Sequence, residues 1–86
     1  MKEIEIGRIS HYFNHISVAA MRIEKGELRK GDKVHIKGHS DDFVQVVGSM
    51  QIEHDSIDVA KSGDDIGFIV DRKVHEGDVV YKVVEE

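Results

Sequence analysis

The sequence has no cysteine among its 86 residues. It therefore forms no disulfide bridge and offers no thiolate for a zinc site. No stretch reaches the roughly 18 apolar residues of a membrane-spanning helix. The amino terminus alternates charged with apolar residues, which is unlike a signal peptide. These absences predict a cytoplasmic protein that makes no membrane contact.

Motifs for nucleotide binding and catalysis are also missing. The sequence contains no G-x-x-x-x-G-K-[ST] phosphate loop, and no strand, loop and helix that would hold one. No pattern indicates a Ser-His-Asp or Cys-His arrangement. The pairs Asp41-Asp42 and Asp64-Asp65 do not converge readily, because neighbouring residues on a strand point to opposite faces. We therefore expect no enzyme, no bound nucleotide and no cofactor.

The formal net charge is −5, whereas proteins that coat nucleic acid without specificity are usually basic. The charge is unevenly distributed. Residues 22–37 contain six bases and three acids, and residues 41–65 contain seven acids and one base. This pattern indicates either a locally positive edge and a strongly negative one, or simply solvated strand faces.

What the sequence does contain is a period of two, which indicates β-strands. Alternating apolar positions mark six segments, at 4–6, 19–24, 33–37, 43–53, 66–71 and 79–84. Turns are predicted between them at 26–31, 38–42, 61–64 and 72–77. Gly-Asp precedes three of the strands, where glycine tolerates a positive φ and aspartate can bond to nearby backbone amides. Only the segment 54–60 looks briefly helical.

Two glycines lie inside predicted strands, Gly7 in the first and Gly48 in segment 43–53. A glycine in a strand often marks a bulge or bend. Six strands with short turns predict a single all-β domain over residues 1–86, a barrel or a sandwich. Closure would remove two exposed sheet edges. We therefore predict a small closed six-stranded antiparallel Greek-key-type β-barrel.

Six histidines raise the question of a metal site. His11 and His15 are four residues apart, as are His35 and His39, but they fall in predicted loops and at a strand end. No set of three ligands is evident, so we predict solvated histidines and no metal site. A smaller alternative is a pH-sensitive contact, because histidine titrates near pH 6.5.

Tyr12 and Phe13 form an adjacent aromatic pair between His11 and His15. Aromatic rings in a polar loop can stack on bases or cover a peptide, and they can equally plug one end of a barrel. We expect one ring to plug the barrel and the other to face a partner.

Three segments together carry a family resemblance. They are GELRKGDKVHIKG at 26–38, the run from Val47 to Gly67 with its GDDIG end, and EGDVV at 76–80. In order and spacing they resemble domain two of elongation factor Tu and of its archaeal and eukaryotic counterpart. The resemblance covers nearly the whole chain. It implies a translation factor domain-two-like barrel, present here as a stand-alone copy without the GTP-hydrolysing domain.

In that family, domain two helps to hold the aminoacylated end of transfer RNA in a shallow surface pocket. The resemblance places Gln51, His54 and Asp65 at positions where the family has Glu, Arg and Asn. An amide replaces a carboxylate, an imidazole replaces a fixed cation, and an anion replaces a neutral amide. Each change weakens the inherited site, so binding of transfer RNA is a hypothesis here.

The favoured interpretation is a non-catalytic binding module that contacts transfer or ribosomal RNA, the ribosome or a translation factor. Its candidate surface comprises His11, Tyr12, Phe13, His15, Arg22, Lys25, Gln51, His54 and Asp65. The alternative is a protein-interaction or accessory β-barrel domain without RNA binding, of the type appended to collagenase-like peptidases. The acidic stretch and the net charge favour that alternative. The sequence leaves the oligomeric state open.

Overall fold

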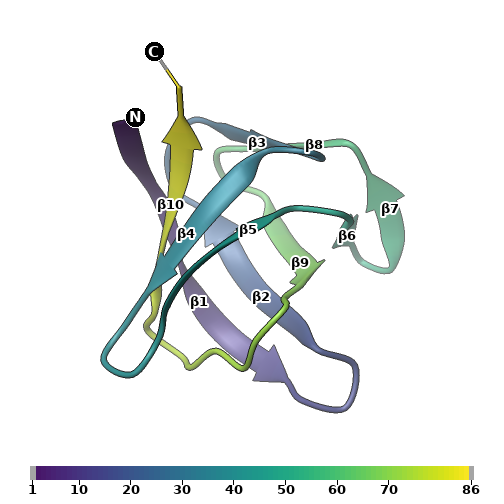
Figure 1. Cartoon of the computed structure of the whole chain (residues 1–86). Coiled ribbons are helices and arrows are strands. Elements are labelled where there is room, and N and C mark those ends of the chain that lie inside the picture. The colour runs from purple at the N-terminus through teal and green to yellow at the C-terminus, as the bar shows by residue number, and fades with distance from the viewer. Residues whose placement is uncertain (1, 86) are drawn as a thin grey trace.

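The structure, a computed structural model, describes residues 2–85. Its regular elements are β1 (Lys2–Phe13), β2 (Val18–Ile23), β3 (Glu27–Arg29), β4 (Lys33–Lys37), β5 (Asp42–Val46), β6 (Met50–Ile52), β7 (Asp55–Ile57), β8 (Val59–Lys61), β9 (Asp65–Ile69) and β10 (Val79–Val84) (Figure 1). The described residues contain no helix, and so none that could span a membrane. The prediction of an all-β fold is confirmed.

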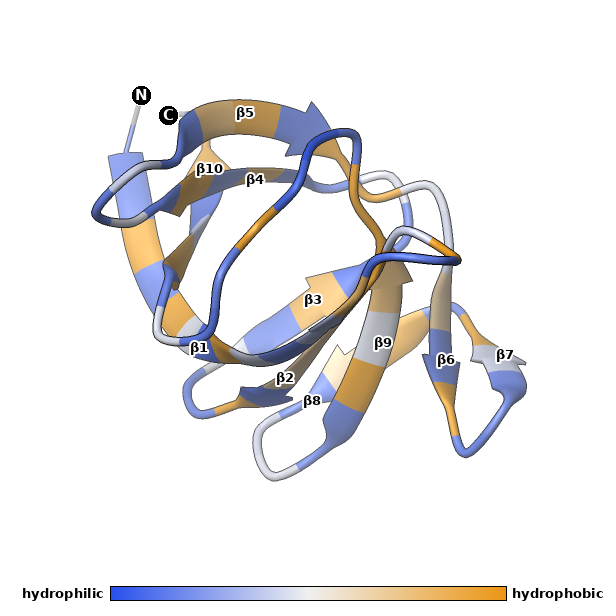
Figure 2. Cartoon of the chain, turned by 90° about the horizontal axis from the view of Figure 1, so that it is seen from below, coloured by the Kyte–Doolittle hydropathy of each residue, from blue (hydrophilic) through white to orange (hydrophobic). Residues whose placement is uncertain are grey.

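Eight strands form one antiparallel sheet in the order β5-β4-β10-β1-β2-β9-β6-β7, and β3 pairs with β8 in a second, two-stranded sheet. The large sheet curls, so that its strands surround a common interior (Figure 2). Phe68 is the largest side chain in the fully buried core, and it packs among Ile, Val, Leu and Met side chains from both sheets. Alternation along each strand thus places one face in the core and the other in solvent.

The predicted closure of the barrel is wrong, because within residues 2–85 no backbone ladder joins β5 to the opposite end of the sheet. Residues 47–49 break the predicted strand 43–53 in two. Its first half, β5, pairs with β4, and its second half, β6, pairs with β9. At the resulting seam the side chain of Gln45 spans the gap. Its Nε2 donates to the carbonyl of Ile69 at 2.9 Å, and its Oε1 accepts the N–H of Asp71 at 2.8 Å.

Three short strands lie where the sequence predicted other structure, so the count of six strands is also wrong. β3 occupies the predicted turn 26–31, and β7 and β8 replace the briefly helical segment 54–60. The pairing of β3 with β8 places Leu28 opposite Ala60, and both side chains are fully buried. A three-residue strand is too short to show a period, and long-range burial determines its conformation.

The bend predicted at Gly7 is confirmed. β1 continues through Gly7 to Phe13, and its register with β10 shifts between Glu5 and Gly7. A second shift, between Ile9 and His11, interrupts its pairing with β2. These irregularities bend β1, which lets a single long strand follow the curl of the sheet.

The three Gly-Asp dipeptides form turns of the same design. Their glycines have φ values of 97°, 97° and 92°, a region that glycine adopts without steric cost. In each turn the aspartate Oδ2 accepts the backbone N–H of the residue three positions earlier, at 2.8, 2.8 and 3.0 Å; the pairs are Asp32 with Arg29, Asp64 with Lys61 and Asp78 with His75. The predicted turn chemistry is confirmed at all three positions.

Candidate partner-binding surface

Three of the predicted site residues share the outer face of β2, β9 and β6. Arg22 lies opposite Asp65 in the β2–β9 ladder, and its Nε is 3.3 Å from Asp65 Oδ1. Gln51 lies opposite Gly67, two residues further along β9. All three side chains are exposed. Arg22 therefore balances the acidic charge that Asp65 places at this position.

Four more predicted residues lie at the end of the β1–β2 hairpin. Tyr12 packs against the core, whereas Phe13 is 45% exposed. The ring of His11 meets that of Phe13 edge-on, with centroids 4.4 Å apart. His15 is exposed in the turn.

Lys25 and His54, the last two predicted residues, are exposed in the β2–β3 and β6–β7 turns. Across residues 2–85, no hydrogen bond or ion pair links the hairpin tip with Gln51, His54 or Asp65. The structure thus presents two groups without mutual polar contact, and their joint use as one surface stays a prediction.

A shallow hollow of about 570 Å³ opens where the chain leaves β5. Apolar side chains and charged groups line it together; the lining residues are Arg29, Lys30, Gly31, Val46, Val47, Gly48, Asp58 and Val59. None of them belongs to the predicted site. A hollow of this composition suits an apolar side chain of a partner flanked by an acidic group.

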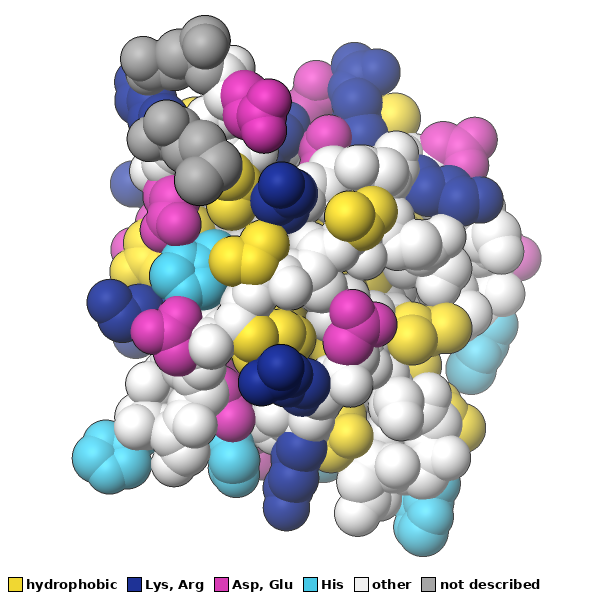
Figure 3. Space-filling view, viewed as in Figure 1, with side chains coloured by type: hydrophobic (Ala, Val, Ile, Leu, Met, Phe, Trp, Pro, Cys, Tyr) yellow, Lys and Arg dark blue, Asp and Glu magenta, His cyan; other side chains and the backbone are white. Residues whose placement is uncertain are grey.

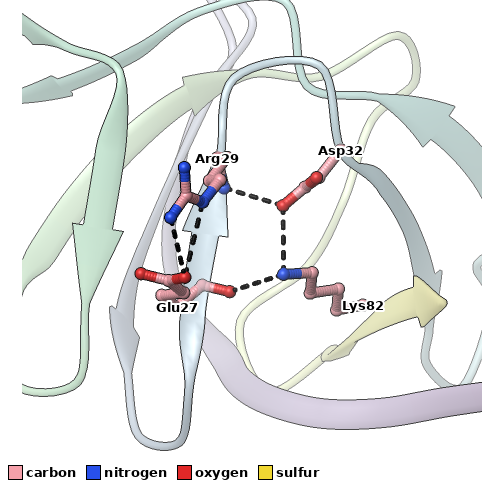
Figure 4. Close-up of polar contacts among 4 residues, drawn as sticks. All are labelled: Glu27, Arg29, Asp32 and Lys82. Atoms are coloured by element: carbon pink, nitrogen blue, oxygen red, sulfur yellow. Dashed lines mark hydrogen bonds and ion pairs between the residues drawn. The ribbon is translucent and has the colours of Figure 1, made fainter.

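A polar network fixes the wall of this hollow (Figure 4). Arg29 bonds to Glu27 Oε1 through Nε at 3.4 Å and through Nη2 at 3.2 Å. Lys82 Nζ donates to the carbonyl of Glu27 at 3.2 Å and lies 3.3 Å from Asp32 Oδ2. Because Asp32 also accepts the N–H of Arg29, the network ties β3, the following turn and β10 together. At the rim of the hollow, the Arg29 guanidinium pairs with Glu27 of the same strand.

An apolar strip adjoins the hollow along the seam between β5 and β9. Val44, Val46 and Ile69 are 52%, 55% and 49% exposed, although each belongs to a strand. Val46 also lines the hollow. We call these three residues, together with the residues that line the hollow, the seam surface. Among the described strands β5 pairs only with β4, so its other edge, which faces β9 across the seam, has no backbone ladder.

His35 forms a second polar cluster, on β4. Its Nδ1 lies 2.9 Å from Glu3 Oε2, and its Nε2 lies 2.5 Å from Asp42 Oδ1. The hydrogen bond to Asp42 raises the pKa of His35, burial opposes that rise, and Glu3 adds to it. The same bond lowers the pKa of Asp42. The cluster joins β1, β4 and β5 most strongly when the imidazole is protonated.

The seam surface could not be found from local sequence patterns. Val44 and Val46 alternate with the buried Phe43 and Gln45, so their outward direction was predictable. A glutamine at an inward strand position is unusual, because a buried amide needs hydrogen-bond partners. That partner lies on β9, and the sequence does not say which strand faces β5.

Two serine hydroxyls are engaged by the backbone. The hydroxyls of Ser10 and Ser62 donate to the backbone carbonyls of Ala20 and Glu24, and the chain has no cysteine. The seam surface combines exposed apolar side chains with the charged groups that line the hollow. These features suit the binding of a protein partner.

A helix-free, curled antiparallel sheet with a shallow seam defines a small all-β module of the kind found within larger proteins. The chain belongs to the elongation factor Tu domain 2 family, which matches residues 17–81.

The curated relatives that the chain resembles include a protease and a collagenase. It is 38% identical over 85 residues to an uncharacterised protease of Methanocaldococcus jannaschii, a match that covers 98% of this chain and 21% of the protease. It is 32% identical over 82 residues to a collagenase of Porphyromonas gingivalis, covering 94% of this chain and 20% of the collagenase. The chain thus spans about a fifth of the length of the curated relatives it matches.

A solved structure has the same fold. The C-terminal domain of a Geobacillus thermoleovorans protein assigned to the U32 peptidases superposes with a TM-score of 0.85 at 22% identity, covering 95% of this chain and 93% of that domain. A selenomethionine variant of that domain gives a TM-score of 0.82 over 88% of this chain.

These comparisons correct the functional prediction. The favoured interpretation, a module that contacts RNA, the ribosome or a translation factor, is wrong, because the relatives are proteases and a collagenase. The domain-two resemblance is right about the fold, but the family shares that fold among proteins of different function. Transfer RNA, ribosomal RNA and translation-related proteins have no support as partners.

Proposed function

We propose that this chain is a non-catalytic accessory domain that works with the body of a U32-family peptidase. The observation that carries the proposal is the coverage of the relatives. Nearly the whole chain matches a fifth of each protease, and the remaining four fifths of each have no counterpart here. The catalytic groups of such a peptidase would then lie in that larger part.

The seam surface supports this role. Three strand residues that are about half exposed stand beside a hollow lined by apolar and charged residues. Apolar strips of this kind on a small domain mark surfaces that another protein covers. The edge of β5 beside the seam has no strand partner, and only the Gln45 side chain crosses from it to β9. We therefore propose that the seam surface docks on the peptidase body.

Capture from a native lysate tests the proposal. The immobilised chain is incubated with nuclease-treated lysate of its own source, and bound proteins are identified by mass spectrometry. We expect to find a U32-family peptidase among the bound proteins, because its binding to the chain does not depend on nucleic acid. A bound fraction composed of ribosomal proteins and RNA, lost after nuclease, would reject the proposal.

A pair of variants tests whether the seam surface is used. Val44→Asp combined with Val46→Asp places charge on the strip, and we expect it to abolish capture. Ile16→Asp changes another exposed apolar side chain, which is 63% exposed in the β1–β2 turn, and we expect it to leave capture intact. Equal capture by both variants would show that the interface lies outside the seam surface.

A further inference from the structure

Three side chains with metal-ligating groups meet at the end of the sheet where the β4–β5 turn faces the β9–β10 connection. Asp41 comes from the turn, and His75 and Asp78 come from the connection. One ligand atom from each lies within 4.8 Å of the other two. Asp41 Oδ2 is 2.8 Å from His75 Nδ1. The spacing of histidines along the sequence gave no sign of this cluster, because its members come from distant segments.

The two carboxylates are largely withdrawn from water. Asp78 is only 4% exposed, and the side chain of Asp41 is 11% exposed, whereas that of His75 is 53% exposed. No lysine or arginine among residues 2–85 forms an ion pair with Asp41 or Asp78. The cluster therefore has two carboxylates facing each other with one titratable imidazole between them and the solvent.

Adjacent carboxylates in a site of low polarity ionise together only when a cation lies close to both. The ligand atoms of Asp41 and Asp78 lie within 4.8 Å of each other and of the His75 imidazole. An ion placed among them would contact both carboxylates.

The backbone around the cluster holds Asp78 in a fixed position. A Cβ atom at Gly38 would lie 1.9 Å from Asp78 Oδ1 and 2.5 Å from its Cγ, so only glycine lets the turn approach this closely. On its other oxygen, Asp78 accepts the N–H of His75 at 3.0 Å. A ligand that is already immobilised loses little freedom when it binds an ion.

A cavity of about 360 Å³ gives access to the cluster, and His39, Ser40 and Glu76 line it together with His75 and Asp78. Several histidine side chains gather at the lower end of the molecule in Figure 3, the end where these loops meet in Figure 1. The cavity leaves room for water or a further side chain on the open side of the cluster.

We propose that Asp41, His75 and Asp78 bind a divalent transition-metal ion of the zinc class. One imidazole and two carboxylates suit such an ion, whereas Ca²⁺ and Mg²⁺ prefer oxygen ligands alone. In a tetrahedral zinc site the ligand atoms are about 3.3–3.6 Å apart, from metal–ligand distances of roughly 2.0–2.2 Å. Small side-chain movements bring the cluster to that geometry. The bound ion links the β4–β5 turn to the β9–β10 connection.

Titration of the metal-stripped full chain with Zn²⁺, followed by calorimetry, tests the proposal, with Mg²⁺ as the comparison ion. We expect one Zn²⁺ per chain and weaker binding of Mg²⁺. Asp41→Asn and His75→Gln each remove one ligand and should weaken Zn²⁺ binding about tenfold or more. Circular dichroism checks that both variants keep the β-fold.

His15→Gln is the matched control, because His15 is an exposed turn histidine outside the cluster. It should bind Zn²⁺ as the unmodified chain does. Absence of Zn²⁺ binding, a preference for Mg²⁺, or an affinity in His75→Gln equal to that of the control would overturn the proposal. The outcome is independent of whether a peptidase binds the seam surface.

Discussion

Gln45 lies at an inward position of β5, between the buried Phe43 and Val47. An amide is tolerated there because both of its polar ends are satisfied across the seam, by the carbonyl of Ile69 and the N–H of Asp71. One side chain thus supplies the contacts that a backbone ladder would provide in a closed barrel. Loss of the Gln45 side chain leaves the Ile69 carbonyl and the Asp71 N–H without this partner.

Gln45→Ala is therefore expected to lower the free energy of unfolding by about 1–3 kcal/mol. Gln51→Ala removes the same amide from the exposed face of β6, and we expect a change within about 0.5 kcal/mol. Urea denaturation of both variants measures the difference. Equal effects would mean that Gln45 does not hold the seam.

His35 gives a prediction of pH dependence. Its pKa is raised in the folded chain. The imidazole therefore holds its proton more tightly in the folded chain than in the unfolded chain. This contribution is complete below the unfolded pKa of about 6.5 and is lost as the pH rises through the higher folded value. The unfolding free energy should therefore fall as the pH rises above about 6.5.

His35→Gln should remove most of that fall, because glutamine does not titrate. Urea denaturation across the pH range, with His15→Gln as a control that keeps the fall, measures it. An unchanged pH dependence in His35→Gln would assign the effect to another group.

At the scale of elements, the Gly-Asp turns show how local chemistry determines where strands begin. In the second of them, Asp64 caps the N–H of Lys61 at 2.8 Å. Its neighbour Asp65 instead pairs with Arg22 at the surface, where both side chains are more than half exposed. Asp64 therefore stabilises the turn, whereas Asp65 forms a surface ion pair.

Asp64→Ala should destabilise the fold by about 1 kcal/mol, the usual cost of losing a side chain that caps a backbone amide. Asp65→Ala should cost less than about 0.5 kcal/mol, because exposed ion pairs contribute little. Thermal unfolding of the two variants compares them. A larger loss in Asp65→Ala would contradict this division.

Some of the strands and turns could be predicted from the sequence, and others could not. Turn chemistry and the alternation of apolar residues gave the long strands, the bend at Gly7 and the three Gly-Asp turns. Leu28 and Ala60 were missed because their strands are too short for a period, and they become strands only by pairing with each other. The break at residues 47–49 was read as a bend, since Gly48 alone does not reveal that the two halves join different strands.

For the whole molecule, local patterns predicted the all-β fold class correctly and the closure of the barrel wrongly. Closure depends on which edges meet, and here a side chain and not a ladder joins β5 to β9. The seam surface and the Asp41, His75 and Asp78 cluster both form where distant segments meet, which explains why neither was visible in the sequence. Within residues 2–85, the predicted residues at the hairpin tip have no polar contact with those on β6 and β9.

The functional prediction failed at this scale for a related reason. The family motifs specify turns and strand ends, which proteins with different partners share. The positions Gln51, His54 and Asp65 had already lost the family chemistry, and the relatives are proteases. The proposed docking site is the seam surface, and the apolar strip of that surface lies outside the family motifs.

Hydrogen exchange tests the central claim most directly. The chain is measured alone and mixed with the Methanocaldococcus jannaschii protease from which the matching segment has been deleted. Docking through the seam surface predicts slower exchange at residues 44–46 and around Ile69, with unchanged exchange at residues 11–16. Protection confined to the hairpin tip, or no protection in the mixture, would contradict the claim.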